Sequence, residues 1–378
     1  MNSWELLLVF AVTAGVTFFV ILLSVGLVIY KVASTAHAAL RGKLYALYSN
    51  AASEFLLAEL PATLFKGKPS NLFAAYESLL EPLKKDLSFA GRFYRTTKWD
   101  TLKSVLLDYS QDVTGEARER LTYAFYSLGF ADEAIRRIGE KQWWVRARAA
   151  KQLGQYRVRR GMFVLTVALD DSRDEVRSQA VQSLISLAGP QALRTIFLHI
   201  KRISRWLAIE LSAEVMRYGP ESVPYLLEAL DVPEPSVVEF AVEMLAEVGF
   251  VDAVEPIRKI ARAYPSLSVR LKAIEALGRL GDTRAELLLL QLTLDPDRQI
   301  RLKSMEALAR TGSPGAADFL LERIADGDVE EKIFAASAIE RMGEKGKRIL
   351  EDMRRSAEPL LGAVADHVQD LSASGAQP

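Results

Sequence analysis

The sequence predicts an all-α protein in which an α-solenoid of helical hairpins follows a single transmembrane helix and a helical juxtamembrane region. Three observations predict this fold: an uncharged apolar run near the N-terminus, a helix-spaced apolar pattern that recurs about every 31 residues, and Gly or Pro between the copies. We expect a short extracytoplasmic tail, the transmembrane helix, a juxtamembrane or capping region, a solenoid of about eight units and a C-terminal tail with a disordered end. The corresponding residues are 1–5, 6–30, 31–112, 113–356 and 357–378.

The N-terminal apolar run, residues 6–29, forms the predicted transmembrane helix. Its 24 uncharged, mostly apolar residues reach roughly 36 Å as a helix, which is enough to cross the hydrocarbon core of a bilayer. Trp4 and Tyr30 bracket the run, and amphipathic rings of this kind suit the two headgroup interfaces.

A cleaved signal peptide is the alternative interpretation of this run. Ala36, His37 and Ala38 offer a small-x-small cleavage site. The apolar run is longer than the roughly 7 to 15 residues of a signal peptide, and no Lys or Arg precedes it. We therefore expect the helix to remain in the mature protein.

Charges flanking the run predict its orientation. Glu5 is the only charged side chain before it, and three cations follow it closely: Lys31, Arg41 and Lys43. By the positive-inside rule, the N-terminus lies outside and the C-terminal bulk is cytoplasmic, as in a single-pass protein of a bacterial inner (plasma) membrane. Ala11 and Gly15 form one small-xxx-small pair, which would allow a weak homodimer through this helix.

The juxtamembrane region reads as helices interrupted at Pro61, at residues 67–69 and at Gly91. Aromatic residues are dense here, and their helical spacing indicates a small core that caps the first repeat. The interleaved cations allow a second interpretation, contact with anionic headgroups worth about 1 kcal/mol for each cation near the surface. Those cations are Lys84, Lys85, Arg92, Arg95, Lys98 and Lys103.

Beyond Asp112, apolar, basic, small and glycine residues recur at fixed offsets. The clearest copy consists of Val269, Arg270, Ala273, Leu277, Leu280 and Gly281. The first positions of the copies are Ala117, Val145, Val176, Leu207, Val237, Val269, Ile300 and Glu331, at spacings of 28, 31, 31, 30, 32, 31 and 31 residues. This regularity indicates one structural unit used repeatedly.

The offsets have a physical explanation. Offsets 0, 4, 8 and 11 lie on one face of a helix, so they form a stripe that must be buried. The small residue at offset 4 lets a neighbouring helix approach, and the final glycine suits a left-handed C-terminal cap. Second amphipathic segments, such as residues 254–261, lie between the copies. Each unit is therefore a hairpin whose apolar face only a neighbouring hairpin can cover.

The run from Val269 to Gly281 resembles the V-R-x-x-A-x-x-A-L-x-x-L-G pattern of HEAT repeats, specifically the short bacterial variety named after phycobilisome lyases. The resemblance covers about 240 residues, from Val113 to Met353, and it implies the fold more than the function because the repeated residues are packing residues. Two copies depart from the pattern, with Ala208 and Val238 in the basic position. If that basic residue pairs with an acid of the neighbouring unit, the pairing is broken there.

The composition argues against several classes of site. The chain has no cysteine, which removes disulfides, thiolate metal sites and cysteine nucleophiles, and its histidines His37, His199 and His367 lie far apart. The resemblance includes a di-iron deoxyhypusine hydroxylase, but that site needs His-Glu pairs on successive repeats, and His199 is the only histidine of the array. We expect no enzyme, no catalytic residue, no metal and no cofactor. A lyase-like accessory factor stays as a second alternative.

Charge is unevenly distributed along the array. From Arg136 to Arg205 there are fifteen bases and five acids, and from Trp206 to Leu267 there are eleven acids and four bases. The basic block holds aromatic and guanidinium groups, which recur at interface hot spots. They define a candidate partner-binding patch: Trp143, Trp144, Arg146, Arg148, Arg157, Arg159 and Arg160. In the competing interpretation, Arg146 and Arg177 pair between repeats and one tryptophan belongs to the core.

These observations predict a non-catalytic, membrane-anchored cytoplasmic scaffold or adaptor that binds a membrane-associated protein partner through its repeat surface. Nucleic-acid binding through the basic first repeats is the first alternative. The balanced total of 48 basic and 48 acidic residues and the membrane anchor both argue against it, so no nucleic acid is expected.

Overall fold

The computed structural model describes residues 3–61, 69–88, 92–311, 314–356 and 359–374. These residues form helices and no strand, and the fold is the predicted α-solenoid of helical hairpins. The chain divides into two compact units, one made of residues 1–140 and 152–161 and the other of residues 141–151 and 162–378.

The first unit contains the juxtamembrane helices and the first hairpin. Its elements are α1 (Ser3–Leu57), α3 (Pro69–Ser88), α4 (Arg92–Asp112), α5 (Gly115–Ser127), α6 (Phe130–Arg137) and the 3-10 turn η1 (Arg159–Gly161). The predicted interruption at Pro61 follows the end of α1. Gly67, Lys68 and Gly91 lie outside the described residues.

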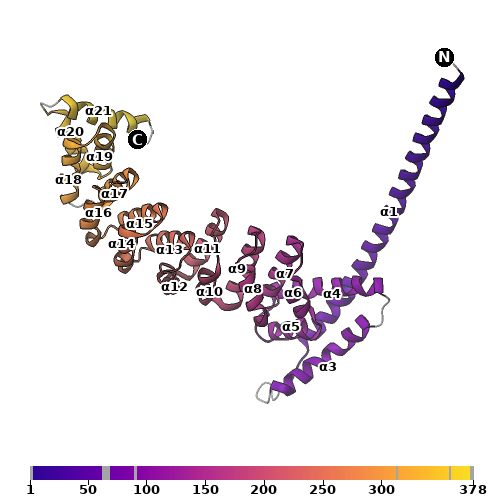
Figure 1. Ribbon diagram of the computed structural model, residues 1–378. Helices are drawn as coiled ribbons and strands as arrows, with labels where there is room; N and C mark the ends of the chain where they lie inside the picture. Colours follow the sequence, from indigo (N-terminus) through magenta and orange to yellow (C-terminus); the bar gives the residue numbers. More distant parts are fainter. Residues whose placement is uncertain (1–2, 62–68, 89–91, 312–313, 357–358, 375–378) are drawn as a thin grey trace. The chain divides into compact units, whose positions relative to one another are not determined.

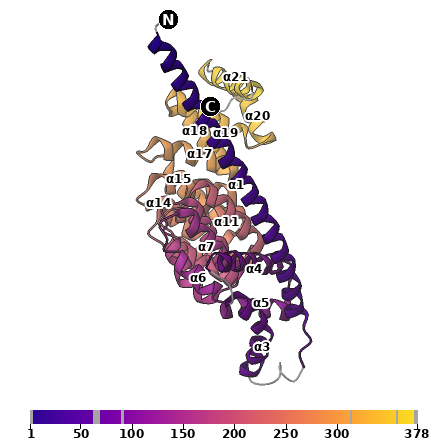
Figure 2. The ribbon, with the colours of Figure 1, turned by 90° about the vertical axis from the view of Figure 1, so that its right-hand side faces the viewer.

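Helix α1 has an apolar half that is exposed and a second half that is packed. Every side chain from Thr13 to Ala39 is exposed, whereas the later half buries one helical stripe. That stripe consists of Leu44, Tyr48, Ala52, Phe55 and Leu56. Helices α3, α4 and α5 lie beside this part of α1 (Figure 2). A small core that includes Tyr48, Phe55 and Tyr76 is therefore present, whereas the aromatic residues Tyr45, Phe73 and Tyr94 are exposed.

Two of the juxtamembrane cations belong to this core. Lys98 and Lys103 are only 8% and 5% exposed, and their ammonium groups are paired with Asp86 and Glu133. Buried, paired cations are not available to lipid headgroups, so the packing interpretation holds for these two residues.

The end of α1 is fastened to the first repeat by Arg120 of α5. Its Nη1 donates to the carbonyl oxygens of Phe55, Leu56 and Ala58 at 3.2, 3.3 and 2.6 Å, and Glu116 pairs with its other side. The last carbonyls of a helix have no partner within the helix and carry partial negative charge. A guanidinium that is 3% exposed satisfies them here.

Helix α7 (Trp143–Gln155) is shared by the two units, and the second unit continues the array. Its other helices are α8 (Met162–Ala168), α9 (Asp174–Ala188), α10 (Ala192–His199), α11 (Arg205–Tyr218), α12 (Val223–Ala229), α13 (Pro235–Glu247), α14 (Val254–Ala263), α15 (Leu267–Leu280), α16 (Glu286–Leu292), α17 (Arg298–Thr311), α18 (Pro314–Asp326), α19 (Val329–Glu340), α20 (Glu344–Arg354) and α21 (Pro359–Ser374). Short 3-10 turns lead into four of them: η2 (Gly189–Gln191), η3 (Gly219–Ser222), η4 (Val251–Ala253) and η5 (Thr283–Ala285).

The helices that carry the repeated pattern, which we call pattern helices, stack on one another. In Figure 1, α11, α13, α15 and α17 follow one another in one row, and α10, α12, α14 and α16 follow in a second row. At offsets 4 and 8 the pattern helices of this unit bury every side chain, as predicted. These residues are Ala180, Leu211, Ala241, Ala273, Ser304, Ala335, Leu184, Val215, Leu245, Leu277, Leu308 and Ile339.

Glycine has two separate uses in α15. Gly281 ends the helix with φ +64°, in the left-handed region that the pattern predicts for it. Gly278, inside the helix, allows close contact with α17: a Cβ added there would lie 2.7 Å from the Ala307 Cα and 2.9 Å from its Cβ. The backbones of these two helices therefore meet where neither residue has a large side chain.

The C-terminal segment differs from the expected tail. Residues 359–374 form α21, which contacts α19 and α20 and buries Val364, Ala365 and Val368. This apolar stripe gives α21 a face to pack, so it covers the end of the array. Residues 375–378 lie outside the described part of the chain.

We predict that Gly278→Ala destabilises the protein, although alanine is the better helix former by about 1 kcal/mol. Overpacking against the α17 backbone costs about 1–3 kcal/mol and exceeds that gain. The matched control is Gly42→Ala in α1, where a Cβ meets nothing within 4 Å and the same change should stabilise. Thermal melts of the full chain in detergent should shift in opposite directions, and a higher melting temperature for Gly278→Ala would contradict the close packing.

Candidate partner-binding surface

Four residues of the predicted patch lie in the first two turns of α7. The rings of Trp143 and Trp144 meet edge to face at 6.0 Å, and the guanidinium of Arg173 lies 5.8 Å from the Trp143 ring. Trp144 is 54% exposed, and Arg148, one turn later on the same face, is exposed as well. The outward-facing part of this group is therefore the pair Trp144 and Arg148.

Arg146 has a structural partner. Its Nε and Nη2 donate to the two carboxylate oxygens of Asp171 at 2.6 and 2.8 Å, and its Nη1 donates to the Lys141 carbonyl at 2.9 Å. Asp171 lies in the loop before α9, 25 residues further along the chain. The structure thus supports the pairing interpretation for Arg146, which is less available to a partner than the sequence alone indicates.

The pairing with a loop acid recurs at Arg270, which donates to Asp295, again 25 residues away, at 2.8 Å. Arg301 instead donates to Glu331 of the next pattern helix at 2.7 Å, and Arg177 pairs with Asp174 of its own helix. In the two repeats that depart from the pattern, Ala208 and Val238 have no charge to offer, and Val238 is buried. The ladder of basic residues is therefore interrupted in these two repeats, as the sequence predicts.

Electrostatics make the Asp171 pair a stabilising one. Burial alone would raise the pKa of the Asp171 carboxyl, but hydrogen bonds from Arg146 and from the Arg173 backbone N–H outweigh it, and the pKa lies below its ordinary value. The carboxylate therefore stays ionised and paired at neutral pH.

The other three patch residues follow the end of α7. Arg157, Arg159 and Arg160 are exposed, and Arg160 lies 4.0 Å from the Asp132 carboxylate. Arg157 has φ +52°, and it is the only non-glycine residue with positive φ among those described. Its N–H donates to the Gly154 carbonyl, and the next N–H donates to Leu153, which is the bonding that a left-handed glycine makes at other helix ends.

The seven patch residues thus form two groups. Trp143, Trp144, Arg146 and Arg148 belong to the second unit, and Arg157, Arg159 and Arg160 belong to the first. Each group is placed within its own unit, and the exposed members are one Trp–Arg pair and one arginine triplet. A left-handed arginine in a position that suits glycine costs about 1–2 kcal/mol, so the triplet is strained at Arg157.

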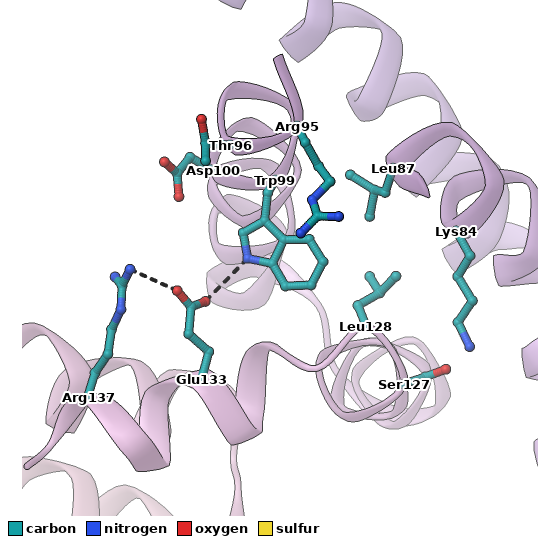
Figure 3. A pocket seen from close by; sticks show the side chains of 10 residues that line it. All are labelled: Lys84, Leu87, Arg95, Thr96, Trp99, Asp100, Ser127, Leu128, Glu133 and Arg137. Atoms are coloured by element: carbon teal, nitrogen blue, oxygen red, sulfur yellow. Dashed lines mark hydrogen bonds and ion pairs between the residues drawn. The ribbon is translucent and has the colours of Figure 1, made fainter. Parts of the chain in front are cut away.

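The first unit also contains a pocket of about 610 Å³ between α4 and the α5–α6 hairpin, with Lys84 and Leu87 of α3 in its wall (Figure 3). Glu133 is its central group. The Trp99 indole N–H donates to Glu133 at 3.3 Å and Arg137 pairs with it at 2.9 Å, the two interactions marked by dashed lines in Figure 3. Lys103, which the figure does not draw, pairs with the same carboxylate.

The chemistry of Glu133 is that of a structural anchor. Burial opposes its charge, but Lys103, Trp99 and Arg137 stabilise the carboxylate, and its pKa lies below the ordinary value. A carboxylate with a lowered pKa and several donors is a weak proton acceptor, so Glu133 is poorly suited to act as a general base. It ties α4 to α6 and fixes the start of the array.

The sequence interpretation missed Glu133, although it singled out Lys103 and the dense aromatic residues of this region, to which Trp99 belongs. The contacts join residues 30 and 34 positions apart, and no periodic pattern connects them. The adjacent acids Asp132 and Glu133, which follow a segment rich in cations and aromatic residues, were the only available signal.

Comparisons with known proteins agree with this class of repeat array. A family profile described as HEAT repeats matches residues 254–340, the part of the chain with the most regular pattern. This match covers less than a quarter of the chain, and it supports a HEAT-like repeat fold for that part of the array. Among curated protein sequences none matches it.

Solved structures of similar fold include several helical-repeat proteins. One is the CpcE–CpcF complex of the phycocyanin lyase of Nostoc sp. PCC7120, at 21% identity over 65% of this chain and 94% of that chain, with a TM-score of 0.28. Another is YibA of Escherichia coli, at 17% identity over 70% and 96%, with a TM-score of 0.36. A third is human deoxyhypusine hydroxylase, at 15% identity over 71% and 96%, with a TM-score of 0.26. At these identities the likeness concerns the fold alone.

We predict that Arg146→Ala lowers the free energy of unfolding by about 1–3 kcal/mol at pH 7, because it leaves a partly buried carboxylate without its donor. Arg148→Ala, on the exposed side of the same helix, is the control and should change it little.

The loss should also depend on pH. The folded-state pKa of Asp171 is below its unfolded value, so its stabilisation is present above about pH 4 and disappears as the pH falls through the folded-state pKa. Denaturant titrations between pH 7 and pH 3 should therefore show the Arg146→Ala deficit shrinking in acid. A deficit that is constant over this range would contradict the ion pair as its cause.

Proposed function

We propose that this HEAT-like protein is a non-catalytic scaffold, held at a membrane by α1, that binds a protein partner through its repeat surface. In this proposal residues 6–30 span the bilayer, residues 31–112 connect and cap, and residues 113–356 form the binding array. The C-terminal bulk lies on the cytoplasmic side, where Lys31, Arg41 and Lys43 follow the span.

The exposed half of α1 supports the anchor. Among the described helices it alone is long and apolar enough to cross a membrane, with a mean hydropathy of 2.3, and none of its apolar window is buried. Side chains such as Phe18 and Ile29, 69% and 63% exposed, would be costly in water and stable in hydrocarbon.

The observation that carries the proposal is the continuity of α1 with the repeat array. The helix runs unbroken from Ser3 to Leu57, its second half forms part of the core, and Arg120 of the first repeat binds its final carbonyls. A span joined by a flexible linker would leave the array free to rotate; here the anchor and the first hairpin are one packed body.

The exposed arginines and Trp144 support partner binding. Arg157, Arg159 and Arg160 are solvent-facing, and Arg157 occupies a left-handed position at the end of α7 that glycine would fill without strain. Strain that a glycine would relieve points to a role for the side chain. In contrast, the buried charged groups, such as Glu133 and Asp171, are held in ion pairs with lowered pKa values, which suits a scaffold better than an enzyme.

We predict that the full chain sediments with membranes and resists extraction by alkaline carbonate, because its apolar half is inserted. A variant with Leu23→Arg and Leu27→Arg should be extracted, since two charges at the centre of a span cost about 5–7 kcal/mol. Two leucine-to-arginine changes, Leu287→Arg on α16 and Leu294→Arg in the turn after it, give the same charge change at exposed sites and should leave the protein in the pellet. Extraction of the unaltered chain would contradict the anchor.

We predict that replacing Arg157, Arg159 and Arg160 by Glu abolishes photo-crosslinking to the partner in native membranes, with little change in melting temperature because all three are exposed. The control has the same charge change on α20, at Lys345, Lys347 and Arg348, which are also exposed. Crosslinking that is equally strong in both triple variants would contradict a role for the arginine triplet.

A further inference from the structure

Helix α11 has a second apolar stripe that the array does not bury. Leu207, Leu211 and Val215 face the core, whereas Trp206, Ile209 and Met216 are 64%, 64% and 52% exposed. Ala213 lies between the last two and is also exposed. Residues 206, 209, 213 and 216 are spaced by three, four and three, which is the spacing with which one helix packs against another.

A groove runs along this stripe between α11 and α13. It encloses about 330 Å³ and is lined by Ile209 and Met216 on one side and by Phe240 and Met244 on the other. Phe240 and Met244 are 5% and 4% exposed, so they form a packed apolar floor. Glu243 and Glu247 of α13 form the rim.

The groove is open because ion pairs that join other neighbouring pattern helices are missing between α11 and α13. Between α13 and α15, Lys272 pairs with Glu243 at 3.3 Å, and between α15 and α17, Lys303 pairs with Glu275 at 3.6 Å. The same two offsets in the α11–α13 pair hold Ala213 and Phe240. Within residues 205–247, all of which the structure describes, no ion pair joins α11 to α13.

The segment that forms the groove is acidic, and the two charged residues that line the groove, Glu243 and Glu247, are both acids. Residues 206–267 carry eleven acids and four bases, a net charge of 4 − 11 = −7. A bilayer with anionic lipids and a second copy of the same acidic surface are both repelled by it, whereas a cationic segment is attracted. The apolar stripe requires a helix with its own apolar face.

We propose that the α11–α13 groove binds an amphipathic helix of the partner, with an apolar stripe flanked by Lys and Arg. The proposal deepens the scaffold function and rests on it, since it assumes a protein partner. The helix lies along Trp206, Ile209 and Met216, and its apolar side chains cover Phe240 and Met244. Its cations share the carboxylates of Glu243 and Glu247 with Lys272 and Arg279 of α15, which pair with them at 3.3 Å.

The test uses the full chain in nanodiscs of zwitterionic lipid, with empty nanodiscs as blank. The probe is a fluorescein-labelled helical peptide of about six turns with Leu at heptad positions a and d and Lys at e and g. A second peptide carries Glu in place of every Lys. Fluorescence anisotropy at two salt concentrations measures both dissociation constants.

We expect the Lys peptide to bind at least about tenfold more tightly than the Glu peptide, and Ile209→Glu to weaken it by about tenfold or more. Leu287→Glu on α16, where the leucine is also 64% exposed, is the matched control and should leave binding within about twofold. Ile209→Ala tests the groove without adding charge and should weaken binding as well.

Equal binding to the Ile209 and Leu287 variants, or preference for the Glu peptide, would overturn the proposal. A dimer in sedimentation that Ile209→Glu dissociates would overturn it too, because the occupant would then be a second copy. If the arginine-triplet variant loses crosslinking but still binds the peptide, the result tests the proposed scaffold function only. The proposal for the α11–α13 groove is then still supported by the peptide binding. If the Lys peptide does not bind but crosslinking is intact, the groove proposal is wrong and the proposed scaffold function is not contradicted.

Discussion

The constraint on which the structure depends is that no hairpin of the array can hide its own apolar stripe. Offsets 4 and 8 are buried in each pattern helix of the second unit, and they are buried against neighbours that carry the same residues. Small side chains such as Ala241 and Ala273 allow the backbones to approach, and Gly278 allows a close approach to Ala307. Stability is therefore shared along the stack, and each end of the stack has to be covered by something that is not another repeat.

The two ends solve this in different ways. At the C-terminal end, α21 supplies Val364, Ala365 and Val368 to cover α19 and α20. At the start, the juxtamembrane helices cover α5, and the link is polar as well as apolar because Arg120 binds the carbonyls at the end of α1. A capping region is thus also the connection to the exposed apolar half of α1. The same packing that terminates the array fixes the direction in which that half leaves the core.

Much of this could be predicted from the sequence, because residues with the same packing role recur at the same spacing in each repeat. The hairpins, the buried offsets and the left-handed glycine at Gly281 follow from spacing alone, and the competing interpretation of Arg146 as a pairing residue came from its place in the pattern. The contacts that could not be predicted are those that occur once. Arg120 reaches carbonyls more than 60 residues away, and Glu133 collects three donors from α4 and α6. Such pairs depend on how unique helices cross, which no repeat encodes.

The repeats at α11 and α13 show how a departure from the pattern becomes a surface. Two sets of ion pairs occur in other repeats. The basic position pairs with a loop acid in Arg146–Asp171 and Arg270–Asp295, and adjacent pattern helices are joined by Lys272–Glu243 and Lys303–Glu275. Ala208 and Val238 remove the first set, and the positions 25 residues beyond them, Pro233 and Ala263, lack the acid as well. Ala213 and Phe240 remove the second set, which uncovers the Ile209 stripe. At each of these places both the basic and the acidic position hold an uncharged residue. The ion pairs are therefore missing from the whole α11–α13 segment, and no single substitution accounts for their absence. Packing gains nothing from exposing Trp206 and Ile209, so the apolar face is explained by what covers it.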